Sequence, residues 1–166
     1  MEGIIIMKKI ITILLTLAVT GMSCVFASEF TKFSRKFIKH IKDCDVYEET
    51  VNSVFEDKQF TTHRKIHGWK NGLCQYTEEI SSKDGAYRLD CRFAEIHIDD
   101  LYEAMKSRSK EPEKYNLEVF EPKVDPKTGE TSYIVKGTTL IKGNKAYITW
   151  AKYQNNPYIC KATKIR

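Results

Sequence analysis

Residues 59–95 read QFTTHRKIHGWKNGLCQYTEEISSKDGAYRLDCRFAE, and apolar and polar residues alternate along most of this segment. Asn71-Gly72 is a strong signal for a two-residue hairpin turn, because both residues tolerate a positive φ. The polar stretch at 81–86 provides a second turn between alternating runs. The segment therefore predicts an antiparallel meander with one buried face and one solvated face.

The pairing register of this meander assigns the apolar side chains to one face of the sheet and the polar side chains to the other. Counting from the two turns places Glu79 opposite both Arg64 and Arg88, and Tyr76 opposite Cys91. A slip of one residue would mix apolar with polar side chains, so the pattern itself supports this register. The expected apolar face carries Trp69, Cys74, Tyr76, Tyr87, Leu89, Cys91 and Phe93. The expected solvated face carries Arg64, Gln75, Thr77, Glu79, Arg88, Asp90 and Arg92. From this second set we take Arg64, Gln75, Arg88 and Arg92 as the candidate ligand-binding residues.

Four cysteines follow residue 27, namely Cys44, Cys74, Cys91 and Cys160. An even count in a small exported chain indicates two disulfides, and a zinc site would need close Cys-x2-Cys pairs, which the sequence lacks. Cys74 and Cys91 are diagonal neighbours in the predicted sheet, about 7 Å apart, whereas bridged Cβ atoms lie about 3.5–4.5 Å apart. We therefore expect Cys44 to pair with one of them and Cys160 with the other.

Residues 1–27 have the pattern of a secretory signal peptide, with a positively charged start, a short apolar run and small residues up to a cleavage site after Ala27. The apolar run is about ten residues long, too short to span a bilayer. A lipoprotein modified at Cys24 is a minor alternative. The chain has 27 basic and 22 acidic residues; removing two lysines and one glutamate with the leader leaves residues 28–166 with a net charge of +4.

Residues 29–43 predict an amphipathic helix, because its apolar residues recur at steps of three or four. The apolar side carries Phe30, Phe33, Phe37, Ile41 and Cys44. The opposite side is basic, with Lys32, Arg35, Lys36, Lys39 and Lys42. Such a helix can pack in a core with solvated lysines, or its basic side can lie on a membrane surface.

A second helix is predicted over 99–109, with Asp99 as its N-cap. Strands are then expected over 115–124, 131–141, 146–153 and 158–164. Gly143-Asn144 serves in this interpretation as a tight turn, which would place Trp150 opposite Gly137. The resulting order is helix–antiparallel meander–helix–antiparallel meander. The predicted fold class is α+β, one disulfide-stabilised exported domain over 28–166 with halves of about 28–97 and 98–166.

No arrangement of residues predicts a catalytic or metal site. His63 and His67 lie four apart in a predicted strand, so their Cα atoms are about 13 Å apart, too far for one metal ion. We expect no metal and no cofactor. No nucleophile or phosphate-binding motif occurs, and neighbouring acids such as Glu78 and Glu79 point to opposite faces of a strand. Export and interleaved acidic residues argue against a nucleic-acid partner.

Residues 44–93 carry Cys44, the segment His63–Tyr76 and Cys91-Arg92-Phe93, and resemble small exported bacterial proteins of uncharacterised function. The resemblance implies a bacterial source and assigns no functional residue. We therefore expect a monomeric, non-catalytic binding or structural domain in the periplasm or outside the cell, with an unknown envelope or extracellular partner. Two alternatives remain: a small secreted hydrolase with a dispersed carboxylate site, and a membrane-surface protein that uses Lys32, Arg35, Lys36 and Lys39.

Overall fold

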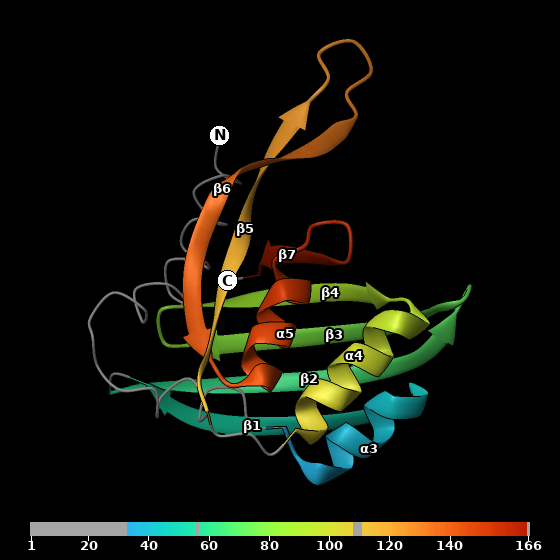
Figure 1. Cartoon of the computed structure of the whole chain (residues 1–166), viewed down its shortest axis with the longest axis vertical. Coiled ribbons are helices and arrows are strands. Elements are labelled where there is room, and N and C mark those ends of the chain that lie inside the picture. The colour runs from blue at the N-terminus through green and yellow to red at the C-terminus, as the bar shows by residue number, and fades with distance from the viewer. Residues whose placement is uncertain (1–32, 56, 108–110, 166) are drawn as a thin grey trace.

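The computed structural model describes residues 33–55, 57–107 and 111–165 (Figure 1). Within these residues the fold is α+β with antiparallel sheets and two disulfides, as the sequence predicts. The helices are α3 (Arg35–Asp43), α4 (Glu95–Lys106) and α5 (Lys145–Gln154). The strands are β1 (Tyr47–Phe55), β2 (Lys58–Lys70), β3 (Leu73–Ser82), β4 (Gly85–Phe93), β5 (Glu113–Val124), β6 (Thr131–Gly143) and β7 (Cys160–Lys164).

The main sheet has the strand order β1-β2-β3-β4-β7, and each neighbouring pair is antiparallel. The register predicted between β3 and β4 is confirmed, because Tyr76 pairs with Cys91 and Glu79 with Arg88. Trp69 also pairs with Cys74 next to the Asn-Gly turn. Strand β1, at one edge of the main sheet, is not among the strands that the sequence predicts.

A β-bulge between Ile66 and Gly68 overturns part of the predicted register of β2. The backbone of Gly68 has a φ of 91°, a conformation that favours glycine. Beyond the bulge Arg64 pairs with Glu78 and not with Glu79, so its side chain lies on the same face as Tyr76. The placement of Arg64 on the solvated face is therefore wrong: the residue is only 2% exposed.

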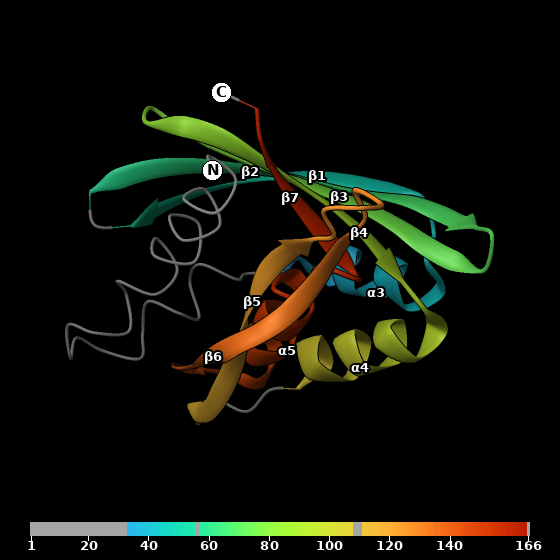
Figure 2. The ribbon, with the colours of Figure 1, turned by 90° about the horizontal axis from the view of Figure 1, so that it is seen from above.

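The three helices and the β5–β6 hairpin lie on one side of the main sheet, and no described helix or strand covers the other face (Figure 2). The core between sheet and helices is rich in aromatic residues, and its largest members are Phe37, Tyr76, Phe93, Leu101, Trp150 and Tyr153. Trp69 was predicted to join them, but it is 46% exposed and its Nε1 donates to the carbonyl of Asp43.

Helix α4 begins earlier than predicted, at Glu95, so Asp99 lies inside it and does not cap it. Ala94 is the N-cap residue, and its backbone N–H donates to Nδ1 of His97 at 3.2 Å. The acceptor at the third helical position therefore takes the role that a glutamate or glutamine has in a capping box.

The segment predicted as a strand over 146–153 is helix α5. Asn144 does not form a hairpin turn with Gly143; it is the N-cap of α5, and its Oδ1 accepts from the backbone N–H of Tyr147 at 2.8 Å. Trp150 consequently does not cover Gly137. It is 2% exposed, and its ring contacts those of Tyr76 and Phe33.

The second predicted meander is also corrected by the strand pairing. Among the described strands, β5 and β6 pair with each other alone, and β7 joins the main sheet beside β4. Figure 1 shows the lower part of the β5–β6 hairpin beside α5 and its upper part, with the tip, extending away from the helices and the main sheet. The fold therefore consists of a five-stranded sheet, a helical layer and a projecting two-stranded hairpin.

The disulfides join Cys44 to Cys74 and Cys91 to Cys160. This connectivity confirms the exclusion of a Cys74–Cys91 bridge. The first bridge fastens the C-terminal end of α3 to β3. The second joins β4 to β7 at residues that are partners in the sheet.

The predicted leader, Cys24 and Lys32 all lie outside the described residues. In the part of the chain that the structure describes, no helix has the length and apolar character needed to cross a membrane.

Candidate binding surfaces

The predicted ligand-binding residues lie on two different faces of the main sheet. Gln75 and Arg92 are partners across β3 and β4, and Arg88 lies on the same outer face. Arg88 donates to Oδ1 of Asp90 at 3.0 Å and to Oε1 of Glu79 at 3.4 Å. The structure thus brings Gln75, Arg88 and Arg92 to one face, without Arg64.

The rest of the outer face is a set of mutually paired polar side chains. Lys65 pairs with Glu48 at 3.1 Å, and His63 and His67 form hydrogen bonds with Thr50 and Thr77 at 3.1 and 3.0 Å. Burial lowers the pKa of His67, and the charges of Lys65 and Arg88 add to this effect. Because these groups already satisfy one another, the outer face has the character of a solvated sheet surface.

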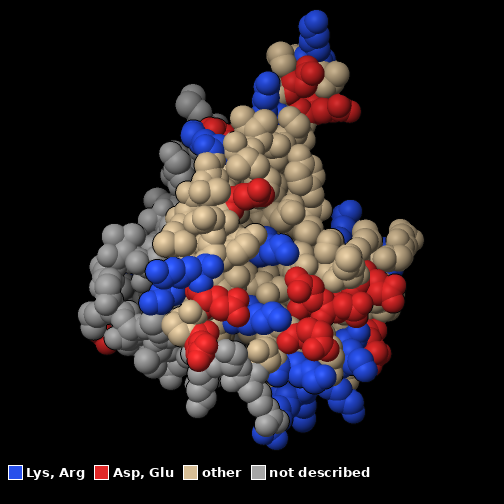
Figure 3. Space-filling view, in the orientation of Figure 1, with Lys and Arg blue, Asp and Glu red and all other residues tan. Residues whose placement is uncertain are grey.

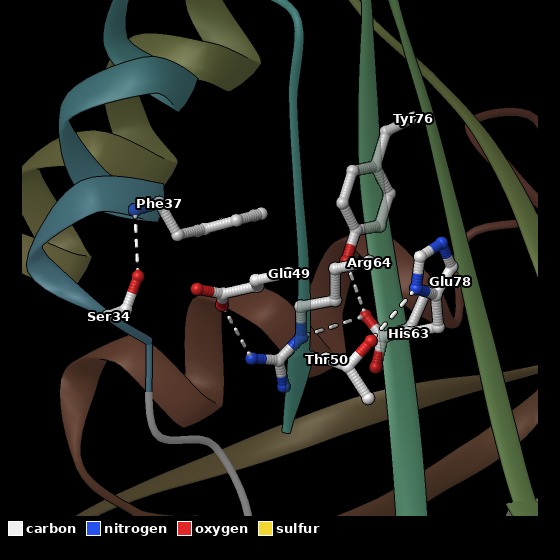
Figure 4. Close-up of polar contacts among 8 residues, drawn as sticks. All are labelled: Ser34, Phe37, Glu49, Thr50, His63, Arg64, Tyr76 and Glu78. Carbon is white, nitrogen blue, oxygen red and sulfur yellow. Dashed lines mark hydrogen bonds and ion pairs between the residues drawn. The ribbon is translucent and has the colours of Figure 1, made fainter.

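On the inner face, Arg64 lies between two carboxylates (Figure 4). Its Nη1 is 3.4 Å from Oε1 of Glu49, and its Nε is 3.7 Å from Oε2 of Glu78. The hydroxyl of Tyr76 donates to the same Glu78 oxygen at 2.6 Å. The side chains of Arg64, Glu49 and Glu78 are 3%, 9% and 4% exposed, respectively. We refer to these four residues as the Arg64 cluster.

Burial and neighbouring charges act in opposite directions on Arg64. Burial lowers the pKa of Arg64, but the charges of Glu78, Tyr76 and Glu49 act against it, and the pKa remains above its usual value. Burial also raises the pKa of Tyr76 well above its usual value, and Glu78 reinforces this effect. The guanidinium additionally lies 4.7 Å from the ring centre of Phe33, at cation–π distance.

The Arg64 cluster brings together two acids that are distant in sequence, as the hydrolase alternative requires. Both carboxylates, however, are engaged by Arg64, and both are shielded from solvent. General acid–base catalysis needs a carboxyl group within hydrogen-bond reach of a substrate. The arrangement suits an ion network that ties β1, β2 and β3 together.

The inward position of Arg64 had one signal in the sequence. Gly68 lies inside a predicted strand, where an isolated glycine indicates a β-bulge, and this bulge turns Arg64 inward.

Helix α3 has basic side chains on its solvent-exposed side. Arg35, Lys36 and Lys39 are exposed, whereas Phe37 and Ile41 are buried in the core. Lys and Arg side chains gather at the lower edge of Figure 3, where α3 lies in Figure 1. Because the apolar side of α3 is already packed, a contact between this helix and a membrane would rest on charge alone.

The β5–β6 hairpin carries the largest concentration of exposed apolar side chains. Near its base, Leu117 and Ile141 pack against Tyr147 and Ile148 of α5. Farther along, the surface in Figure 3 is mostly uncharged up to the tip. The large apolar residues exposed there are Val124 (59%), Ile134 (49%), Val135 (52%) and Leu140 (54%).

Most of these side chains share one face of the hairpin. Leu117 and Ile141 point toward α5, and side chains alternate along each strand. The strand pairing therefore assigns the opposite face an apolar group made of Phe120, Pro122, Val124, Tyr133, Val135 and Leu140. We call this group the hairpin apolar face. Tyr158 packs edge-on against Tyr133, with ring centres 5.6 Å apart.

Comparison with known proteins adds no functional residue, because no family model, curated protein or solved structure matches the chain. The fold defines a disulfide-stabilised α+β protein with an aromatic core and a projecting hairpin. Its candidate functional surface rests on the geometry described above.

Proposed function

We propose that this protein is an exported, non-catalytic domain that binds another polypeptide, and that the β5–β6 hairpin is its binding element. The two disulfides support export, because such bridges persist in oxidising compartments. The leader pattern in residues 1–27 supports it as well. The proposal moves the binding surface from the outer sheet face to the hairpin.

The observation that carries the proposal is the exposure of the hairpin apolar face. Each buried Å² of apolar surface is worth about 25 cal/mol, so large side chains held in water are a source of binding energy. Val124, Val135 and Leu140 are all more than half exposed. Exposed apolar side chains grouped on one face, beyond what scattered surface residues would give, are typical of protein–protein contact sites.

Site-specific photo-crosslinking tests the hairpin as a binding element. A photoreactive amino acid is placed at Val124 or Val135 of the hairpin apolar face in the full chain, expressed in cells that export it. The matched control carries it at Asn52, which is exposed on the outer sheet face. We expect adducts of defined mass from the two hairpin positions and none from the control. Equal labelling at all three positions, or no adduct at the hairpin, would reject the proposal.

Export is tested separately by cell fractionation and N-terminal sequencing. The expected product is found outside the cytoplasm, begins at Ser28 and contains no free thiol in its mature part. A chain that stays in the cytoplasm with its cysteines reduced would contradict the export proposal. A lipid-modified Cys24 at the N-terminus would identify the lipoprotein form.

Contact with an anionic membrane is a second candidate, favoured by the exposed cations of α3. Arg35, Lys36 and Lys39 form no ion pair with any residue that the structure describes. Each cation near an anionic bilayer contributes about 1 kcal/mol, so Lys36→Glu with Lys39→Glu should weaken binding to phosphatidylglycerol vesicles by at least about thirtyfold. Vesicle binding that this double variant leaves unchanged would exclude a role for α3.

A further inference from the structure

The backbone edges of the β5–β6 hairpin differ in what they can bind. In an antiparallel pair, two opposed residues direct their N–H and C=O groups either toward each other or away from the pair. Tyr133 directs both groups outward, because its N–H donates to the hydroxyl of Tyr158 and its carbonyl accepts from it, both at 3.3 Å. The carbonyl of Glu118 also points outward, because it accepts from Nδ2 of Asn155.

The edge of β5 is interrupted. Pro122, the partner of Tyr133, shares its outward orientation and has no N–H to offer. Four residues earlier, the carbonyl of Glu118 is occupied by Asn155. A polypeptide aligned along β5 would therefore find a missing donor and an occupied acceptor.

The edge of β6 has one uninterrupted stretch. Thr138 pairs with Glu118, and Leu140 and Lys142 follow at steps of two, so all three direct their backbone groups outward. Hydrogen bonds to these groups from other described residues are absent. The stretch lies on the side of the β-bulge nearer to α5. The side chains of Thr138, Leu140 and Lys142 are exposed. We call Thr138–Lys142 the β6 edge.

We propose that the β6 edge binds an extended segment of another protein as an additional strand. This inference rests on the proposed function and specifies how the hairpin would act. Main-chain hydrogen bonds supply affinity in strand addition, and side chains on one face supply specificity. An exposed edge strand of this kind otherwise promotes aggregation. The five residues of the β6 edge match the length of an ordinary strand.

The side chains along the β6 edge indicate the chemistry of the segment. Leu140 belongs to the hairpin apolar face, and Lys142 lies two residues farther along that face. Directly opposed side chains on one face of a sheet interact, and apolar pairs and pairs of opposite charge stabilise it. The segment is therefore expected to carry an apolar residue opposite Leu140 and, two positions away, an acidic residue opposite Lys142.

A peptide probe tests this mode of binding. The probe has about nine residues, mainly serine and threonine, with one valine and one glutamate two positions apart. Its control has the same sequence with N-methyl groups on alternate amides, which removes donors but keeps the side chains. The oxidised mature chain should bind the probe measurably at concentrations up to about 1 mM. It should bind the methylated control about tenfold more weakly or not at all.

Two proline variants place the binding on one edge. Thr138→Pro removes an outward N–H from the β6 edge, and Asn116→Pro removes the equivalent N–H from β5. Neither N–H bonds within the hairpin, so both variants should fold, which circular dichroism and thermal unfolding will check. Thr138→Pro should lose probe binding by about tenfold, and Asn116→Pro should retain it. The methylated probe gives an independent answer if either variant unfolds.

Several outcomes would overturn strand addition: no binding of the probe, equal binding of the methylated probe, or equal effects of the two proline variants. Sedimentation of the mature chain distinguishes a second copy; a dimer that only Thr138→Pro dissociates would assign the edge to self-association instead. If crosslinks at Val124 form while the edge tests fail, the hairpin binds by its apolar face. In that case the proposed function stands and only strand addition is wrong.

Discussion

The guanidinium of Arg64 lies between two carboxylates in the protein interior, and no other residue of the Arg64 cluster is basic. Arg64→Met would leave Glu49 and Glu78 buried without this cation. Removing one partner of a buried ion pair costs about 3–5 kcal/mol. We expect a loss of that size in the free energy of unfolding, measured by urea denaturation.

The matched control is Arg88→Met. Arg88 also binds two carboxylates, but its side chain is 41% exposed, and exposed ion pairs contribute about 0–1 kcal/mol. Similar losses for the two variants would show that the Arg64 cluster is open to water.

His97 gives the free energy of unfolding a defined pH dependence. Burial lowers the pKa of His97, Lys152 adds to this effect, and Asp100 opposes it. The stabilisation is therefore complete above the unfolded value of about 6.5 and is lost as the pH falls through the lower folded value. Protonation also removes the acceptor for the N–H of Ala94, a cap worth about 1 kcal/mol.

The measurement compares the wild type with His97→Gln, which keeps a capping acceptor and does not titrate. Urea unfolding between about pH 7.5 and pH 5 should show a loss for the wild type beyond that of the variant. Parallel curves for the two proteins would mean that His97 has the same pKa in the folded and the unfolded protein, so that it contributes no pH dependence.

At the level of the element, α5 shows where local sequence signals conflict with the fold. Tyr147, Ile148, Thr149 and Trp150 all favour strands, and Gly143-Asn144 resembles a tight turn. The same asparagine is also a good N-cap, and packing decides between the two interpretations. As a helix, the segment buries Trp150 in the main core and Ile148 against the hairpin.

Substitution of Asn144 tests the capping role. Asn144→Ala should lower the free energy of unfolding by about 1 kcal/mol, because the N–H of Tyr147 loses its acceptor. Asn144→Asp keeps the acceptor and should retain the stability. If aspartate were as damaging as alanine in chemical denaturation, the loss would not come from the cap.

The elements that the sequence predicts well are those with short-range determinants. The Asn71-Gly72 turn fixes the hairpin, and alternation fixes the pairing of β3 with β4. The bulge at Gly68 is a single-residue event, yet it reverses the face of Arg64. The difference between the two edges of the hairpin was not predictable, because the groups that occupy Glu118 and Tyr133 come from the distant residues Asn155 and Tyr158.

For the whole molecule, pairing of β7 with β4 is a long-range contact that local patterns do not contain. The cysteines did restrict where the C-terminal strand could lie. Because a Cys74–Cys91 bridge was excluded, Cys160 had to pair with a cysteine in the first half of the chain. The α+β class, the presence of two disulfides and the exclusion of a Cys74–Cys91 bridge were therefore predictable, whereas the choice between Cys74 and Cys91 as the partner of Cys44 was not. The position of β5, β6 and α5 relative to the main sheet was not.

The two disulfides should contribute different stabilities. The chain-entropy relation gives about 3.6 kcal/mol for a sequence separation of 30 residues and about 4.4 kcal/mol for 69 residues. Replacing Cys91 and Cys160 by alanine should therefore lower the thermal midpoint slightly more than replacing Cys44 and Cys74. Calorimetry of the two double variants measures this order, and a clear reversal would contradict the entropic origin.

The Cys91–Cys160 bridge also determines what a protease would leave behind. The tip of the β5–β6 hairpin is exposed and contains Lys127, between the two bridged residues. A trypsin cut there should produce two fragments that migrate together without reductant and separate once the bridge is reduced. A single cut at this exposed hairpin tip would thus leave the two pieces covalently joined for as long as the bridge stays oxidised.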